Sequence, residues 1–274
     1  MKRLAIIAIL SIICSIAGAQ TAHWITADDP TCNERNVWIE FRKDFDLKKK
    51  VKKAETRIAA DSKYWLYVNG QCVVFEGGLK RGPNPNDTYY DMVDLAPYLR
   101  KGKNEVKFLL WYFGKSGFSH KSSGQSGMIF ESPSIGLVSD SSWLSQRLDA
   151  YRTAGKPVVN YRLSEANILY DARLEGQDGY KPSVELGEWG CKPWNNLILR
   201  PIPQWKDYGV KPLEYTVSND GEGNTILTAR LPYNAQMTPV IDLDAAEEGV
   251  LVKMETDHIM GGSENCVRAE YTTR

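Results

Sequence analysis

The sequence predicts an all-β protein built as a sandwich of short strands. Runs of alternating apolar and polar residues, such as residues 37–43, recur along the chain with the period of a half-buried strand. Clusters of Gly, Pro, Asn and Asp separate these runs, as expected of turns between strands. Apolar spacing typical of amphipathic helices is scarce after the first segment of the chain.

The clearest local element is a β-hairpin centred on Asn69 and Gly70. These residues separate two strand-like runs, 64–68 and 71–75. Asn-Gly favours the type I′ turn, whose twist suits a two-residue hairpin. Further along, residues 94–102 predict one short helical turn that Asp94 caps, and residues 106–112 predict the next strand.

Residues 1–19 have the features of a secretory signal peptide. A cationic start precedes a largely apolar run over residues 4–16, and residues 17–19 are small. This run is shorter than the roughly 20 residues that a membrane-spanning helix needs. We therefore expect a secreted or periplasmic protein that has no membrane association after cleavage.

The composition favours a folded core and excludes one class of partner. Of 274 residues, 42% are hydrophobic and 11% aromatic. The 34 basic and 34 acidic residues balance, which argues against nucleic acid as a partner. The lysine-rich residues 48–53 are expected to be a solvated strand edge.

The four cysteines after the signal segment leave three disulfide pairings open, and their spacing matches no zinc motif. They are Cys32, Cys72, Cys191 and Cys266.

Prolines near position 212 predict a division of the chain. Pro201, Pro203 and Pro212 mark a linker, which separates a first domain over residues 20–212 from a second region over residues 213–274. Strand-like runs occur in the second region at 225–230, 240–243 and 250–254. This region is small for an independent sandwich, so we expect it to be an incomplete β domain.

Several short segments resemble one enzyme family. They are Tyr67-Val68-Asn69-Gly70, Tyr90-Asp91 before Asp94-Leu95, residues 99–106, Trp111, and the later segments 140–143, 170–175 and 234–239. Together they resemble the amino-terminal jelly-roll domain of bacterial α-L-rhamnosidases, glycoside hydrolase family 78, and the start of the β domain that follows it. Related patterns occur in sugar-binding domains of other glycosidases.

The resemblance implies a galactose-binding-like jelly-roll sandwich followed by part of a second β-sandwich. It also implies noncatalytic β domains that support hydrolysis of terminal α-L-rhamnose from glycans. In that family the catalytic carboxylates belong to a helical (α/α)6 barrel, which we expect beyond the carboxyl end of this sequence. No cofactor is expected, although a structural calcium ion is compatible with jelly rolls of this superfamily. The alternative is a self-standing carbohydrate-binding module.

No carboxylate pair in the sequence predicts hydrolysis, which needs two carboxyl groups about 5 to 10 Å apart. Asp91 and Asp94 are expected to be turn and cap residues, and Asp171 and Arg173 a structural ion pair.

Aromatic and polar residues predict a carbohydrate surface, because sugar C–H faces stack on rings while polar groups bind the hydroxyls. Strand alternation turns Trp65 and Tyr67 outward if the more apolar residues 64, 66 and 68 face the core. Their alternative role is packing under a loop or against a neighbouring domain. We also expect the loops 80–87 and 118–120 to rim a shallow pocket. The candidate residues are Trp65, Tyr67, Arg81, Asn84, Trp111, Tyr112 and His120.

Overall fold

The computed structural model describes residues 21–79, 86–118, 120–155, 163–176, 178–231, 233, 238–255 and 268–274. Strands dominate this part of the chain, and its helices are four short 3-10 turns: η1 (Pro30–Asn33), η2 (Ala96–Tyr98), η3 (Pro133–Ile135) and η4 (Ala172–Leu174). None of these described helices has the length and apolarity to cross a bilayer. The predicted all-β fold class is confirmed.

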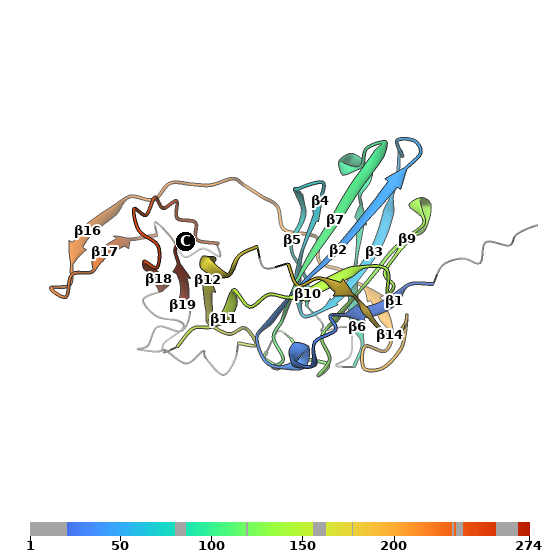
Figure 1. Cartoon of the computed structure of the whole chain (residues 1–274), viewed down its shortest axis with the longest axis horizontal. Coiled ribbons are helices and arrows are strands. Elements are labelled where there is room, and N and C mark those ends of the chain that lie inside the picture. The colour runs from blue at the N-terminus through green and yellow to red at the C-terminus, as the bar shows by residue number, and fades with distance from the viewer. Residues whose placement is uncertain are drawn as a thin grey trace, which may run out of the picture.

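Two sheets form the sandwich (Figure 1). The strands of the seven-stranded sheet are β1 (His23–Thr26), β3 (Glu55–Asp61), β6 (Thr88–Asp94), β8 (Gly127–Ser132), β9 (Leu137–Val138), β14 (Val184–Glu188) and β15 (Leu197–Leu199). They follow the order β14-β1-β8-β3-β6-β15, with β9 paired to β8. The strands of the six-stranded sheet are β2 (Val37–Leu47), β4 (Lys63–Val68), β5 (Gln71–Gly78), β7 (Gly102–Tyr112), β10 (Leu144–Arg147) and β13 (Lys181–Pro182). Their order is β13-β10-β2-β7-β4-β5.

The main core lies between these sheets. Ile58 and Phe130 from one sheet belong to the same buried cluster as Phe41 and Phe108 from the other. Tyr64 stacks on Phe108 with ring centroids 4.6 Å apart. Each sheet also buries apolar residues on its outer face, which gives two smaller clusters, one for each sheet. These outer clusters determine where the candidate sites lie.

The predicted hairpin joins β4 to β5. Asn69 and Gly70 both have positive φ, 51° and 79°, as a type I′ turn requires. The Asn69 side chain fixes the turn further, because it donates to the carbonyl of Tyr98 at 2.9 Å and accepts from the amide of Glu105 at 3.0 Å. The short turn η2 follows as predicted, with Asp94 accepting from the Ala96 amide at 3.0 Å.

A third sheet takes strands from both sides of residue 212. Its strands are β11 (Tyr151–Thr153), β12 (Ile168–Asp171), β18 (Leu251–Glu255) and β19 (Arg268–Thr272). β12 pairs in parallel with β19, so the predicted boundary at 212/213 does not separate the sheets. The remaining hairpin, β16 (Tyr215–Asn219) with β17 (Thr225–Ala229), is exposed along its whole length. Residues 240–243, predicted as a strand, have no regular structure.

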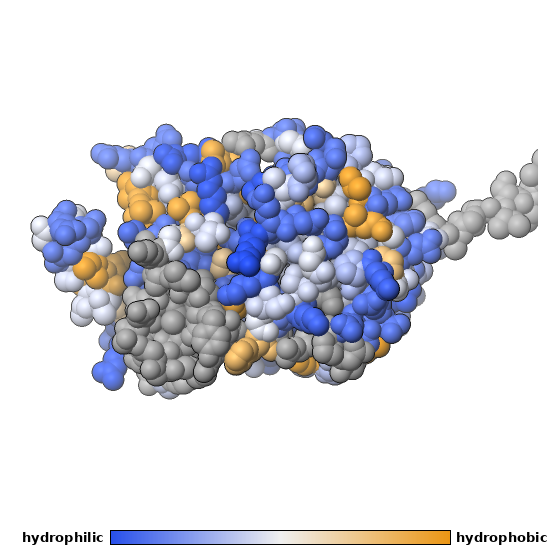
Figure 2. All heavy atoms as spheres, turned by 90° about the horizontal axis from the view of Figure 1, so that it is seen from below, coloured by the Kyte–Doolittle hydropathy of each residue, from blue (hydrophilic) through white to orange (hydrophobic). Residues whose placement is uncertain are grey.

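Large apolar side chains are exposed in the segment that links β15 to the hairpin. Trp205, Tyr208 and Val210 are 57%, 74% and 76% exposed. Figure 2 shows a mostly hydrophilic face on which apolar residues gather in separate patches.

Two sequence expectations concern cysteine and lysine. Cys32, Cys72 and Cys191 are free thiols within the described residues, and Cys266 lies outside them. Burial raises the pKa of Cys32 to about 12, which keeps this thiol protonated. The lysine-rich residues 48–53 lie in the loop between β2 and β3 and not in a strand edge, because β2 ends at Leu47.

Candidate functional site

Three of the candidate aromatic residues lie on the outer face of the six-stranded sheet. Trp65 and Tyr67 turn away from the core, as the alternation predicts, but both are half-buried. Trp65 stacks on Trp38 at 5.4 Å, and Trp111 stacks on the same ring at 4.8 Å. Tyr151 covers Trp38 from the β11 segment at 4.1 Å. We call Trp38, Trp65, Trp111 and Tyr151 the aromatic stack.

The aromatic stack is a packing unit. Trp111 is 6% exposed, and its indole N–H donates to Asn36 Oδ1 at 2.7 Å. Asn36 in turn donates to Thr153 in β11 at 2.8 Å. These contacts support the alternative role considered for the outward aromatic residues, namely packing under a neighbouring segment.

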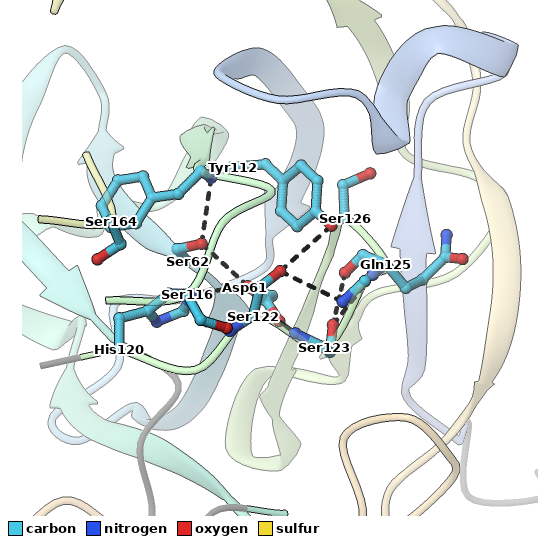
Figure 3. A network of polar contacts seen from close by, with 12 residues as sticks. Asp61, Ser62, Tyr112, Ser116, His120, Ser122, Ser123, Gln125, Ser126 and Ser164 are labelled. Atoms are coloured by element: carbon cyan, nitrogen blue, oxygen red, sulfur yellow. Dashed lines mark hydrogen bonds and ion pairs between the residues drawn. The ribbon is translucent and has the colours of Figure 1, made fainter. Parts of the chain in front are cut away.

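Tyr112 and His120 lie in a buried polar network below the surface (Figure 3). His120 Nε2 is 3.4 Å from Asp61 Oδ1, and both side chains are fully buried. Asp61 Oδ2 accepts from the Ser123 amide at 2.9 Å, while Ser122 and Tyr112 share a 3.4 Å hydrogen bond. Burial raises the pKa of Tyr112. The network anchors the loop between β7 and β8.

The structure therefore places Trp111, Tyr112 and His120 beneath the surface and not at the rim of a pocket. The expectation of a rim position was made from loop composition. It was wrong for these three residues because composition does not show which side chains turn inward. Arg81 and Asn84 lie outside the described residues.

A loop over residues 189–196, between β14 and β15, covers the outer face of the seven-stranded sheet. Trp194 anchors it, since this ring is fully buried and stacks on Trp24 with centroids 4.0 Å apart. Gly127 in β8 permits this approach, because a Cβ there would lie 3.1 Å from the Trp194 ring. Thr88 fixes the loop backbone. Its hydroxyl donates to the Trp194 carbonyl at 2.8 Å, and its amide donates to the Asn196 carbonyl at 2.9 Å. The loop is thus held in place before any ligand arrives.

Residues at the two ends of this loop line a shallow cavity of about 360 Å³, which we call the aromatic hollow. Its lining residues are Arg57, Tyr90, Trp189, Gly190, Asn196 and Leu197. The Arg57 guanidinium lies 4.7 Å from the Trp189 ring centroid and forms an ion pair with Glu131. Tyr90 meets Trp189 edge-on at 6.1 Å. An aromatic wall with a cation, a phenol and an amide is the combination that carbohydrate recognition uses.

Other residues of the same loop line a second cavity of about 420 Å³, which we call the basic hollow. Its lining residues are Asn86, Lys121, Ser122, Ser123, Lys192, Pro193 and Asn195. Asn86 belongs to the predicted loop 80–87, and Lys121 directly follows the predicted loop 118–120. The structure thus brings the ends of these two loops together, although the rings expected to accompany them, those of Trp111, Tyr112 and His120, are buried.

The acidic residues considered in the sequence are structural. Asp91 is buried and accepts from the Tyr64 hydroxyl at 2.8 Å and from Arg200 Nε at 2.5 Å, so it is not the turn residue expected. Burial and this carboxylate raise the pKa of Tyr64 well above its usual value. Asp171 and Arg173 form the predicted ion pair at 2.8 Å.

The described lining of both hollows is neutral or basic. No lining residue of either cavity is an Asp or Glu. Within the described chain, no group of three or more His, Cys, Asp or Glu side chains is placed to hold a metal ion.

Sequence reasoning missed Arg57, Tyr90, Trp189 and Asn196 as site residues. They come from three separate segments that meet only through the pairing of β3 with β6 and of β6 with β15. One signal was present: the alternation of residues 56–60 turns Arg57 to the face opposite Ile58.

No family model matches the sequence, and no curated protein matches it. Among solved structures, a family 78 rhamnosidase from Bacillus sp. GL1 is 29% identical over 68% of this chain and 20% of that chain, with a TM-score of 0.56. The predicted resemblance is confirmed. α-L-Rhamnosidases from Dictyoglumus thermophilum and Aspergillus terreus each cover 92% of this chain and 31% of their own, at 18% identity and a TM-score of 0.60. The rhamnosidase-like chain therefore spans about a fifth to a third of these proteins.

Proposed function

We propose that this chain is a noncatalytic β portion of a secreted or periplasmic rhamnosidase-type glycoside hydrolase, and that it binds carbohydrate in the aromatic hollow. The observation that carries the binding role is the placement of Trp189, Tyr90, Arg57 and Asn196 around one shallow cavity on a fixed loop. The similarity to part of solved rhamnosidases supports the parent class.

The physical basis is complementarity between a sugar ring and this cavity. The apolar C–H face of a pyranose packs against the indole of Trp189, while its hydroxyls bond to the Asn196 amide and the Tyr90 phenol. Arg57 is oriented by Glu131, so its remaining N–H groups are available in a fixed direction. Terminal α-L-rhamnose, with its methyl group, is the sugar that the parent class favours.

We place hydrolysis in a helical barrel domain of the full protein. Two observations support this division: the resemblance covers only a fifth to a third of the solved rhamnosidases, and the described hollows have no lining carboxylate. The exposed Trp205, Tyr208 and Val210 are consistent with contact to such a domain.

The second candidate function is a self-standing carbohydrate-binding protein. The intact mass of the native protein separates the two. A mass far above 30.9 kDa supports a module within a larger hydrolase, and a mass slightly below 30.9 kDa supports the self-standing protein.

Substitution of Trp189 tests the binding role. We expect Trp189→Ala to weaken binding of a rhamnose-terminated oligosaccharide about tenfold, equivalent to about 1.4 kcal/mol, because the stacking face is lost. Isothermal titration calorimetry on the purified chain measures this change. Trp205→Ala is the matched control, since that exposed ring lies outside the hollow.

Equal affinity of Trp189→Ala and the parent chain, with the fold intact by circular dichroism, would exclude the aromatic hollow as the site. Hydrolysis of an aryl rhamnoside by the purified chain, abolished by changing one carboxylate, would contradict the noncatalytic assignment.

A further inference from the structure

The basic hollow is lined by two lysines and, among the described residues, by no Asp or Glu. Lys121 and Lys192 come from different segments, the β7–β8 loop and the 189–196 loop, and line the same cavity. Neither forms an ion pair with any described carboxylate, whereas Lys53 and Lys63 pair with Glu55 and Glu76. Two lysines that line one cavity, with no acidic residue in its described lining, favour an anionic ligand.

The neutral walls of this cavity are fixed by hydrogen bonds. Ser123 is held from below, since its amide donates to the buried carboxylate of Asp61 at 2.9 Å. The Asn195 side chain donates to the carbonyls of Asn86 at 2.7 Å and Pro193 at 3.1 Å. The hydroxyl of Ser122 lies at the same wall and shares a hydrogen bond with Tyr112. A ligand therefore meets polar groups that are already positioned, which lowers the entropy cost of binding.

Asp87, which follows the lining residue Asn86, is buried and accepts from Asn196 Nδ2 at 3.3 Å. Asp61 is the acidic group that bonds to Ser123 at this wall. It is fully buried, and its two oxygens are engaged by Ser62, Ser123 and His120. Its carboxylate is therefore committed to the interior and does not supply a partner for the two lysines at the surface.

The two hollows share one structural element. Trp189 and Asn196 face the aromatic hollow, while Lys192 and Asn195 face the basic hollow, and all four belong to the loop that Trp194 anchors. A ligand that occupies both cavities would present a neutral ring to one and an anionic group to the other.

We propose that the basic hollow is a subsite for the anionic group of an acidic glycan, bound between Lys121 and Lys192. This inference rests on the proposed carbohydrate-binding function and names its ligand class. Uronic-acid carboxylates and sulfate esters share the required chemistry. The neighbouring sugar ring of the same chain occupies the aromatic hollow.

The experiment compares three trisaccharide probes by calorimetry on the full chain: trigalacturonate, its carboxyl-reduced neutral counterpart, and a neutral trisaccharide bearing one sulfate ester. We expect an anionic probe to bind about tenfold more tightly than the neutral one at low salt, and the difference to shrink as ionic strength rises. A carboxylate preference and a sulfate preference distinguish the two sources of the anion.

Charge-neutralising variants assign this preference to the cavity. The double variant Lys121→Gln with Lys192→Gln should lose the preference for the anionic probe and keep its affinity for the neutral one. The matched control is Lys49→Gln with Lys50→Gln, which makes the same change in net charge. Lys49 and Lys50 follow Leu47, which pairs with Gly102 at one end of β2. Tyr112, which bonds to Ser122 of the basic hollow, pairs with Val37 at the opposite end of that strand.

The outcomes separate this inference from the proposed function. Equal binding of neutral and anionic probes, or equal effects of the two lysine pairs, overturns the anionic subsite and leaves carbohydrate binding standing. Failure of all three probes, while the rhamnose-terminated oligosaccharide still binds, overturns the anionic subsite alone, and failure of that oligosaccharide as well overturns both. Loss of anionic preference in the Lys121 and Lys192 variant alone, together with weaker binding by Trp189→Ala, supports both.

Discussion

The two outer faces of the sandwich carry similar aromatic side chains but are covered by different segments of chain. On the six-stranded sheet, Tyr151 lies on Trp38, and Trp111 is closed from solvent. On the seven-stranded sheet, Trp194 covers Trp24 completely while the same loop leaves Trp189 at the wall of an open hollow. The comparison shows that the segment above a tryptophan decides whether it packs or presents a binding face.

The outer face of the six-stranded sheet also contacts the third sheet. From the aromatic stack, ring contacts continue from Tyr151 to Tyr170 at 4.6 Å and from Tyr170 to Tyr271 at 5.7 Å. These residues lie in β11, β12 and β19 of the third sheet. The aromatic stack therefore attaches this sheet to the sandwich, and in doing so it buries the rings of Trp38 and Trp111.

The largest expected effect comes from removing the centre of the aromatic stack. Trp38→Ala should lower the free energy of unfolding by about 4 kcal/mol, because a buried ring with three aromatic neighbours is replaced by a cavity in a central strand that cannot collapse. Urea denaturation followed by circular dichroism measures this loss. A loss below about 1 kcal/mol would mean that the segment bearing Tyr151 is not packed on the sheet.

A smaller effect is expected on the other face. Trp194→Ala should cost about 3 kcal/mol, because the ring is equally buried but lies on a loop that can relax around the vacancy. Urea denaturation of this variant gives the stability change. Since the loop carries both hollows, calorimetry should also show weaker binding of any glycan that the parent chain binds; unchanged binding would place the ligand elsewhere.

The smallest expected effect is a loss of folding stability at alkaline pH that arises from Tyr151. Burial raises the pKa of Tyr151 to about 12, whereas the unfolded chain has a tyrosine pKa of about 10. Between these pH values the unfolded state loses this proton while the folded state keeps it, so the stability contribution present below pH 10 is lost as the pH rises toward 12. We expect a loss on the order of 1 to 2 kcal/mol.

Tyr151→Phe should remove that part of the alkaline loss when urea denaturation is repeated from pH 9 to 12. Tyr208→Phe, at a 74% exposed position, is the matched control and should leave the pH dependence unchanged. Identical pH profiles for Tyr151→Phe and the parent chain would show that this phenol is not buried in solution.

Local rules account for the features that the sequence predicted. The Asn69–Gly70 hairpin follows from backbone conformation, and the Asp171–Arg173 ion pair from side chains two residues apart. Strand alternation also predicted that Trp65 and Tyr67 turn away from the core. None of these conclusions required knowledge of which strands are neighbours.

The sequence by itself determined the strand character, the turns and the inward or outward direction of side chains, because these depend on residues close along the chain. Only the tertiary structure decided which outward rings are covered, and it assembled Arg57, Tyr90 and Trp189 into one hollow. It likewise brought Lys121 to Lys192. Such contacts depend on strand order and on the paths of long loops, and the packing of the whole core selects these through interactions between residues far apart in sequence.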